Sequence, residues 1–268
     1  MADDASGGAL WTSGNSYERY VGRWSRPVAR EFLAWLGAPP RARWLDVGCG
    51  TGALTETILA TQAPTSVKGI DPSEAFVGFA REHVRDARVA FAVGRAEALE
   101  GDAASVDAVV SGLALNFVPD PKKAALEFAR VLHSDGIAGA YVWDYAGEMQ
   151  MMRHFWDAAV ALDPGAADLD EARRCPICNP ESLSALWRTA GIGDVEVRAI
   201  DAVTIFANFD DYWEPFLGGR APAPAYAMSL SVDRRTALRE SLRQRLSADE
   251  GGAIRLVARA WAVKGAAP

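Results

Sequence analysis

Short apolar runs alternate with amphipathic segments through the first half of the chain, between about residues 43 and 143. Each run is continuously apolar, which is typical of a strand buried on both faces of a parallel sheet. The predicted strands are Arg43–Val47, Val67–Ile70, Val89–Val93, Val106–Ser111 and Ile137–Trp143. The predicted helices cover Leu54–Ala60, the residues from the cap Ser73 to about Val84, and Pro121–Leu132. Strands that alternate with helices predict an α/β fold.

The regular alternation ends after residue 144. Two further β-rich runs, Val195–Phe206 and Ile254–Val263, are separated by a long segment and predict an antiparallel pair at the sheet edge. We expect 1–16 to be a flexible tail and 17–268 to form one domain. Its core would comprise 40–145, 182–208 and 253–265, and the insertions 146–181 and 209–250 would form a lid. Before the first strand, a helix is expected with Pro27 in its first turn.

The junction of the first strand and its helix carries the most specific motif, Leu45-Asp46-Val47-Gly48-Cys49-Gly50-Thr51-Gly52. Glycines allow the backbone to turn tightly and to approach a ligand closely. An open parallel sheet binds ligands at the carboxyl ends of its strands, where this loop lies. The motif therefore predicts a small-molecule site at that edge.

Asp71 ends the next predicted strand, and an acidic side chain there can accept hydrogen bonds from a ribose diol. Dinucleotide-binding proteins use a G-x-G-x-x-G spacing with a pyrophosphate on the helix N-terminus. Here the spacing is G-x-G-x-G, and no basic residue stands near for a phosphate. A nicotinamide-dependent oxidoreductase is therefore the less favoured alternative, and a cofactor with an amino-acid moiety fits better.

With these residues in place, the sequence resembles the class I S-adenosylmethionine-dependent methyltransferases, especially the ubiquinone/menaquinone-type branch. The resemblance covers about residues 17 to 145 and resumes at the late strands. Its five ordered pieces are Leu45–Gly52, Ile70-Asp71-Pro72-Ser73, Gly94-Arg95-Ala96-Glu97-Ala98-Leu99, Val106–Ser111, and Arg130-Val131-Leu132 before Gly136. It implies a Rossmann-like, doubly wound seven-stranded sheet, mostly parallel with an antiparallel edge strand, plus lid insertions.

The resemblance also implies the cofactor, S-adenosyl-L-methionine, with S-adenosyl-L-homocysteine as product, and a role for particular residues. Gly48 and Gly50 would lie against the methionine part, and Asp46 would order its ammonium group, directly or through water. Asp71 would hold the ribose hydroxyls. Pro72, Ala96 and Glu97 would flank the adenine, Leu113 would pass close to the methyl group, and Tyr20 would act as a lid. These residues form the expected cofactor site.

Catalytic residues are harder to assign, because methyl transfer is an in-line displacement that depends mainly on positioning. A base is needed only for a protonated acceptor. His154 is the histidine that we consider as a base, and Asp144 and Tyr145 follow the fifth strand. Many relatives carry a histidine after the fourth strand, where this chain has Asn116. Asn116 can orient a substrate but cannot accept a proton.

The insertions are expected to form the acceptor pocket, because they are rich in aromatic residues and methionine. Tyr212 and Trp213 are the predicted substrate contacts, since aromatic side chains suit a flat, apolar acceptor. The same residues could equally be the core of a lid subdomain. The acceptor is expected to be a small molecule, and the sequence does not distinguish O-, N-, C- and S-methylation.

Bulk properties restrict the partners. The 268 residues carry a formal net charge of −7, which disfavours a nucleic-acid partner. No apolar run approaches the ~20 residues of a membrane-spanning helix. The three cysteines do not form a disulfide framework, so a cytoplasmic location is expected. The pair Cys175 and Cys178 has no second pair to complete a zinc site, and a thioredoxin-type pair is disfavoured by its place in an insertion.

We therefore predict a methyltransferase acting on a small-molecule acceptor, with no metal site. The alternative from another class is an S-adenosylmethionine-binding protein that does not methylate, because donor binding and acceptor chemistry are separable. The sequence does not indicate an oligomeric state.

Overall fold

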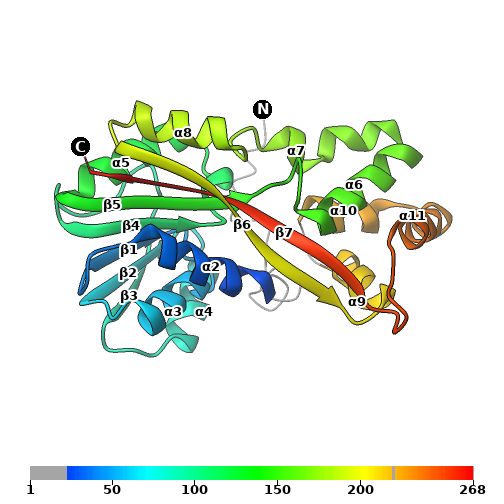
Figure 1. The fold of residues 1–268 in the computed structure, drawn as a ribbon, viewed down its shortest axis with the longest axis horizontal. Coiled ribbons are helices and arrows are strands. Elements are labelled where there is room, and N and C mark those ends of the chain that lie inside the picture. The colour runs from blue at the N-terminus through cyan, green and yellow to red at the C-terminus, as the bar shows by residue number, and fades with distance from the viewer. Residues whose placement is uncertain (1–22, 219–220, 268) are drawn as a thin grey trace.

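The computed structural model describes residues 23–218 and 221–267 (Figure 1). They contain a seven-stranded sheet in the order β3-β2-β1-β4-β5-β7-β6. The strands are β1 (Arg43–Val47), β2 (Ser66–Asp71), β3 (Val89–Val93), β4 (Val106–Gly112), β5 (Leu132–Trp143), β6 (Gly193–Phe206) and β7 (Ile254–Ala266). The expected doubly wound, mostly parallel sheet is confirmed.

The first five strands pair in parallel, and β7 runs antiparallel to both of its neighbours, β5 and β6. The antiparallel strand therefore lies one position in from the edge, which β6 occupies. The predicted turn before the fifth strand lies inside β5. Val106 pairs with Leu132 and Ala108 with Ile137, so the intervening residues of β5 form an irregularity that accommodates the turn-forming Gly136.

Helices cover both faces of the sheet. The α-helices are α2 (Arg23–Leu36), α3 (Ala53–Thr61), α4 (Glu74–His83), α5 (Pro121–Val131), α6 (Gln150–Leu162), α7 (Glu171–Arg174), α8 (Pro180–Thr189), α9 (Phe209–Trp213), α10 (Pro222–Ser229) and α11 (Val232–Arg245). In the part of the chain that the structure describes, the 3₁₀ turns are η3 (Leu115–Phe117), η4 (Pro164–Leu169) and η5 (Glu214–Leu217). Pro27 lies at the fifth described position of α2 and not in its first turn as expected, because helical residues precede it.

Neighbouring residues of β5 show which helix covers which face. A Cβ added at Gly139 would lie 2.6 Å from Leu36 of α2. The next residue back, Ala138, pairs with Gly265, where an added Cβ would approach Trp187 of α8. Adjacent strand residues face opposite sides, so α2 and α8 cover opposite faces. Figure 1 shows α3 on the side of α2, and α5 next to α8.

The two insertions pack together beyond the carboxyl end of β5, against the extended β6–β7 pair (Figure 1). Their apolar faces form a continuous part of the core. Phe155 of α6 stacks on Phe216 at 4.4 Å between ring centroids, and Trp156 packs against Tyr226 at 5.7 Å. These rings are buried. The aromatic residues of the insertions are therefore mainly a helical core.

Two searches of the described residues bear on function. None of their helices is both long and apolar enough to cross a bilayer. In the same residues, no three or more His, Cys, Asp or Glu side chains gather into a group that could hold a metal ion.

Candidate functional site

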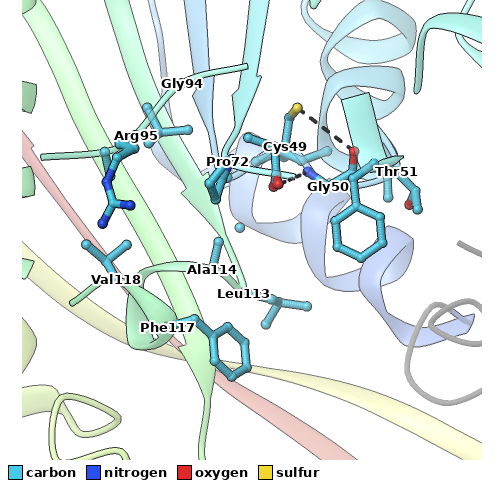
Figure 2. A pocket seen from close by; sticks show the side chains of 18 of the residues that line it. Cys49, Gly50, Thr51, Pro72, Gly94, Arg95, Leu113, Ala114, Phe117 and Val118 are labelled. Carbon is cyan, nitrogen blue, oxygen red and sulfur yellow. Dashed lines mark hydrogen bonds between the residues drawn. The ribbon is translucent and has the colours of Figure 1, made fainter. Parts of the chain in front are cut away.

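A cavity of about 290 Å³ opens at the carboxyl ends of β1, β2, β3 and β4 (Figure 2). Its walls come mainly from the loops that follow these strands and from the starts of α3 and α4, together with Ser25 of α2 and Tyr141 of β5. Strand pairing explains the convergence. Val47 pairs with Ile70, and Asp46 pairs with Val110, so the loops after β1, β2 and β4 emerge side by side. The cavity occupies the edge at which an open parallel sheet binds ligands.

The glycine loop after β1 forms the floor of the cavity. Gly48 and Cys49 donate their N–H groups to the carbonyl of Ile70, at 2.8 and 2.9 Å, which fixes the loop to β2. Gly48 has a φ of +75°, and a Cβ there would lie 2.4 Å from the Cβ of Ala114. Any larger residue would therefore push the loops after β1 and β4 apart. Gly50 also has a positive φ and has nothing within 4 Å of an added Cβ, so its backbone is open to a ligand.

Asp71 joins this loop to β2 and lines the cavity. Its Oδ2 accepts the Gly50 N–H at 3.0 Å, and its Oδ1 accepts the Ser73 N–H at 2.9 Å. Burial raises the pKa of this carboxyl, and the two backbone hydrogen bonds oppose that shift. Each oxygen keeps a lone pair, so Asp71 can still accept hydrogen bonds from a ligand diol.

Asp46 lies beneath the cavity. It is fully buried, and its Oδ2 accepts the Thr55 hydroxyl hydrogen bond at 2.6 Å. Its Oδ1 has no partner among the described residues. Burial raises its pKa to about 7, and the negative charge of Asp71 acts in the same direction. A buried carboxylate oxygen without a donor is costly, so this atom suits a water molecule or another donor that links it to a ligand in the neighbouring cavity.

The comparisons with known proteins agree with this geometry. Residues 45–139 match the family model described as a methyltransferase domain. The chain is 34% identical over 161 residues to a trans-aconitate 2-methyltransferase of Variovorax paradoxus, covering 59% of each protein. It is 37% identical over 108 residues to a ubiquinone biosynthesis O-methyltransferase of Hahella chejuensis, covering 39% of this chain and 44% of that protein. The chain thus matches about three fifths of the first relative and under half of the second.

Solved structures share the fold. A phosphoethanolamine N-methyltransferase 2 of Haemonchus contortus, in complex with S-adenosyl-L-methionine, superposes with a TM-score of 0.60 at 18% identity, covering 95% of this chain and 56% of that chain. The YcgJ protein of Bacillus subtilis superposes with a TM-score of 0.56 at 17% identity, covering 90% and 98%. The [4+2]-cyclase SpnF superposes with a TM-score of 0.52 at 19% identity, covering 96% and 86%.

Residues 45–139 are thus similar to a methyltransferase domain, and the relatives that the chain matches over part of its length are methyltransferases. The cavity fits the cofactor on two independent observations. The glycine loop leaves room for a ligand where side chains would fill the space, and Asp46 presents an unpaired buried oxygen below it. The similarity of residues 45–139 to a methyltransferase domain favours S-adenosylmethionine over a nicotinamide cofactor.

The structure gathers most of the predicted cofactor residues around one cavity. Its lining includes Gly48, Gly50, Asp71, Pro72, Ala96, Glu97 and Leu113. Asp46 is not part of the lining, so any influence on the cofactor passes through the glycine loop or a water molecule. Tyr20 lies outside the described residues. Leu113 has a φ of +58°, a conformation rare for a residue with a side chain, and its N–H donates to the Tyr141 carbonyl at 2.8 Å.

Tyr141 is a lining residue that the sequence analysis missed. Its side chain is 1% exposed and packs against Phe32 of α2 at 4.8 Å between ring centroids. A Cβ at Gly112 would lie 2.6 Å from the Tyr141 hydroxyl oxygen, so the phenol reaches the end of β4. Because Tyr141 stands within the apolar run of β5, its sequence pattern indicates an ordinary core residue. Phe117 and Phe76 also line the cavity without having been predicted.

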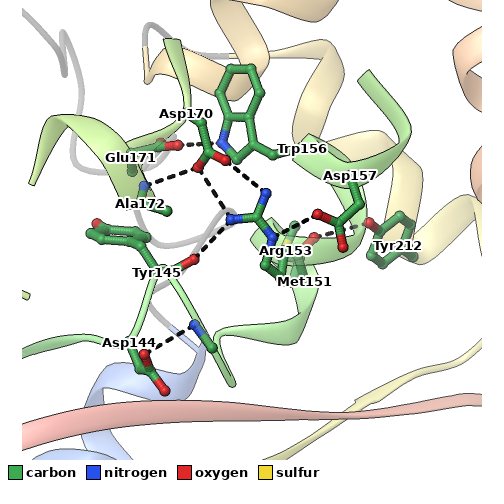
Figure 3. Close-up of polar contacts among 11 residues, drawn as sticks. Asp144, Tyr145, Met151, Arg153, Trp156, Asp157, Asp170, Glu171, Ala172 and Tyr212 are labelled. Atoms are coloured by element: carbon green, nitrogen blue, oxygen red, sulfur yellow. Dashed lines mark hydrogen bonds and ion pairs between the residues drawn. The ribbon is translucent and has the colours of Figure 1, made fainter. Parts of the chain in front are cut away.

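The predicted catalytic residues do not line the cavity. The Asp144 carboxylate accepts the N–H groups of Gly147 and Glu148, at 3.1 and 2.9 Å, and so closes the turn before α6 (Figure 3). Tyr145 is buried, and its carbonyl accepts a hydrogen bond from Arg153 at 3.2 Å. His154 lies in α6, where burial lowers its pKa. In this arrangement Asp144 and Tyr145 have structural contacts, and His154 is outside the cavity.

The predicted substrate residues also lie elsewhere. Tyr212 is fully buried, and its hydroxyl donates to the Met151 carbonyl at 3.0 Å. Trp213 packs against Phe216 in the same helical core. Asn116 lies in η3, behind the cavity wall, and its amide donates to the sulfur of Cys175 at 3.9 Å. The direct substrate contacts expected for Tyr212 and Trp213 are therefore not what this structure presents, because the insertion buries both rings against its own helices.

Proposed function

We propose that the chain transfers a methyl group from S-adenosylmethionine to a small-molecule acceptor, by in-line displacement governed by positioning. The observation that carries the proposal is the single cavity at which the glycine loop, Asp71 and the loop after β4 converge. The cofactor, when bound, supplies an activated methyl group on a sulfonium. The remaining steps depend on how this chain's residues hold the two reactants.

In this proposal, different residues along the cavity hold different parts of the cofactor. The Gly48–Gly50 backbone receives the methionine part, and Asp71 accepts hydrogen bonds from the ribose hydroxyls. Ala96 and Glu97 flank the adenine. The backbone at Leu113, held by its hydrogen bond to Tyr141, sets the position of the methyl group.

The acceptor would approach beside Leu113, where Phe117 and Tyr141 also line the wall. The aromatic side chains at this end favour an acceptor with an apolar body. The described lining contains no histidine, and burial raises the pKa of the Cys49 thiol well above its usual value. The lining therefore supports catalysis by alignment of an acceptor that arrives as a competent nucleophile.

The insertions 146–181 and 209–250 are proposed to restrict access to the acceptor side as a lid. Their packing beyond the carboxyl end of β5 supports this role, as does the contact between Asn116 and Cys175. A cytoplasmic location is part of the same proposal, and the three free cysteines support it.

The test combines binding and turnover. Calorimetry with S-adenosylhomocysteine should give a measurable affinity for the wild type and a loss of ~2–3 kcal/mol for Asp71→Ala, because hydrogen bonds to a buried charged acceptor are removed. Asp168→Ala is the matched control, since the Asp168 side chain is 90% exposed. Equal affinities for wild type and Asp71→Ala would mean that the ribose is held elsewhere.

A turnover assay distinguishes a methyltransferase from a cofactor-binding protein that does not methylate. A panel of carboxylates and phenols, chosen because trans-aconitate and ubiquinone methyltransferases are similar in sequence, is incubated with the protein and S-adenosylmethionine. Release of S-adenosylhomocysteine with a methylated product supports the proposal. Binding without turnover across every acceptor class would favour a cofactor-binding protein that does not methylate; a [4+2]-cyclase has the same fold.

A further inference from the structure

Two cysteines meet in a turn next to the cofactor cavity. Cys175 ends the short helix α7, and Cys178 directly precedes Asn179, whose side chain caps α8. The Cys178 N–H donates to the Cys175 carbonyl at 3.0 Å, which closes the turn. Interaction with the Cys178 side chain is the largest influence on the pKa of the Cys175 thiol, and it lowers that pKa. The two cysteines are therefore held on one tight turn at an i, i+3 spacing, which places their side chains near each other.

The two thiols have different environments. Cys175 is half-buried and reachable from solvent, whereas Cys178 is 5% exposed. The hydrogen bond from Cys178 lowers the pKa of Cys175, with smaller contributions from the Asn116 amide and the charge of Arg174, while burial and Asp170 oppose it. The pKa of Cys178 is raised by the same hydrogen bond and by burial, and the carboxyls of Asp144 and Glu171 add to this.

This asymmetry suits thiol oxidation, because the accessible thiol is the one whose deprotonation is favoured and the second, buried thiol beside it stays protonated. A metal is not an alternative within the described residues, because no group of three or more ligating side chains includes this pair. The position in the fold adds a feature to the sequence expectation of an insertion. The pair does belong to the first insertion, but it stands at the start of a helix that covers the sheet.

We propose that Cys175 and Cys178 are a redox-modification site that forms an intramolecular disulfide with peroxides and thereby weakens cofactor binding. The Cys175 thiolate attacks one oxygen of hydrogen peroxide, the O–O bond breaks, and hydroxide leaves, giving the sulfenic acid. The Cys178 thiol then attacks the Cys175 sulfur. The S–O bond breaks, water leaves with the Cys178 proton, and the S–S bond forms. One peroxide is reduced to two molecules of water as two thiols are oxidised.

The connection to the cavity runs through η3. Asn116 donates to the Cys175 sulfur, while its neighbours Ala114 and Phe117 line the cavity. Ala114 lies directly against Gly48 of the glycine loop. A disulfide sulfur is a poorer hydrogen-bond acceptor than a thiolate, so oxidation removes a contact that holds this wall. The coupling rests on the proposed function, whereas disulfide formation does not.

The first experiment measures disulfide formation directly. The full chain is treated with graded hydrogen peroxide, remaining thiols are alkylated, and peptides are mapped by mass spectrometry. We expect a Cys175–Cys178 disulfide at the lowest peroxide doses, and dithiothreitol should reverse it. The buried Cys49 should remain a reduced thiol that is alkylated only after the protein is unfolded. Cys178→Ser should instead accumulate a Cys175 sulfenic acid that dimedone traps. Two free thiols at doses that oxidise Cys49, or direct conversion of Cys175 to sulfinic acid in the wild type, would overturn the proposal.

The second experiment separates the local chemistry from its consequence. Asn116→Ala should slow Cys175 oxidation at least about threefold, because a hydrogen bond to the thiolate is lost. Calorimetry with S-adenosylhomocysteine should show an affinity at least about threefold lower for the oxidised than for the reduced wild type, and no such difference for Cys178→Ser. A disulfide with unchanged affinity would overturn the coupling. If neither form binds, the proposed function fails while the disulfide result stands.

Discussion

Replacing Asp46 by asparagine should reduce the dependence of both folding stability and cofactor affinity on pH. Asp46 is fully buried, and its pKa is raised from 3.8 to about 7, first by burial. A carboxyl with a raised pKa binds a proton more tightly in the folded state. Its stabilising contribution is therefore complete below pH 3.8 and is lost as the pH rises through about 7.

The magnitude follows from the shift. Each pKa unit corresponds to about 1.4 kcal/mol, so a rise from 3.8 to about 7 corresponds to a loss of ~4 kcal/mol of folding free energy between those pH values in the ligand-free protein. Urea unfolding at pH 5 and pH 8 measures the part of this loss that lies above pH 5, about two pKa units or ~3 kcal/mol. The asparagine side chain of Asp46→Asn stays neutral. The free energy of unfolding of this variant should therefore fall less than that of the wild type over the same pH range, and the difference is the contribution of the Asp46 carboxyl.

Cofactor binding should show the opposite slope. If the ammonium group of the ligand interacts with Asp46, binding favours the charged carboxylate, and S-adenosylhomocysteine affinity rises with pH up to about 7 and then levels off. Binding below pH 7 then releases a proton, which calorimetry in two buffers of different ionisation enthalpy detects. Asp46→Asn should release none. Identical pH profiles and proton release for wild type and variant would refute the reasoning.

Three further substitutions test other parts of the site. Gly48→Ala should remove measurable S-adenosylhomocysteine binding with the fold retained by circular dichroism, because its Cβ would lie 2.4 Å from that of Ala114; unchanged affinity would mean that the two loops separate easily. His154→Ala should lower the turnover number by less than the ~10²-fold typical of a lost general base, and a larger loss with a vanished pH inflection near neutrality would make His154 the base. Tyr212→Phe should lower the free energy of unfolding in urea by ~1 kcal/mol, because the hydrogen bond to Met151 is lost, and should leave the Michaelis constant unchanged. A raised Michaelis constant with wild-type stability would instead indicate that Tyr212 contacts the substrate.

Local patterns in the sequence were sufficient for the sheet and for one side of the cavity. The strand Val89–Val93 has the predicted bounds, and the Ser73 hydroxyl caps α4 by accepting the Phe76 N–H. The glycine loop and Asp71 could be brought together from sequence because adjacent parallel strands end at the same edge. Each of these inferences depends on contacts within a strand, a turn or a neighbouring pair.

The roles of Tyr212, Tyr141 and Asn116 were decided only by tertiary structure. A buried aromatic ring has the same sequence signature whether it packs on helices or lines a cavity, and Tyr212 packs on α6 while Tyr141 reaches Gly112. The contact of Asn116 with Cys175 joins residues 59 positions apart, through an insertion whose placement no local period encodes. Strand periodicity and turn chemistry act over a few residues and can be read directly. Which apolar faces bury one another is a property of the whole chain, because burial depends on every surface that competes for the same contact.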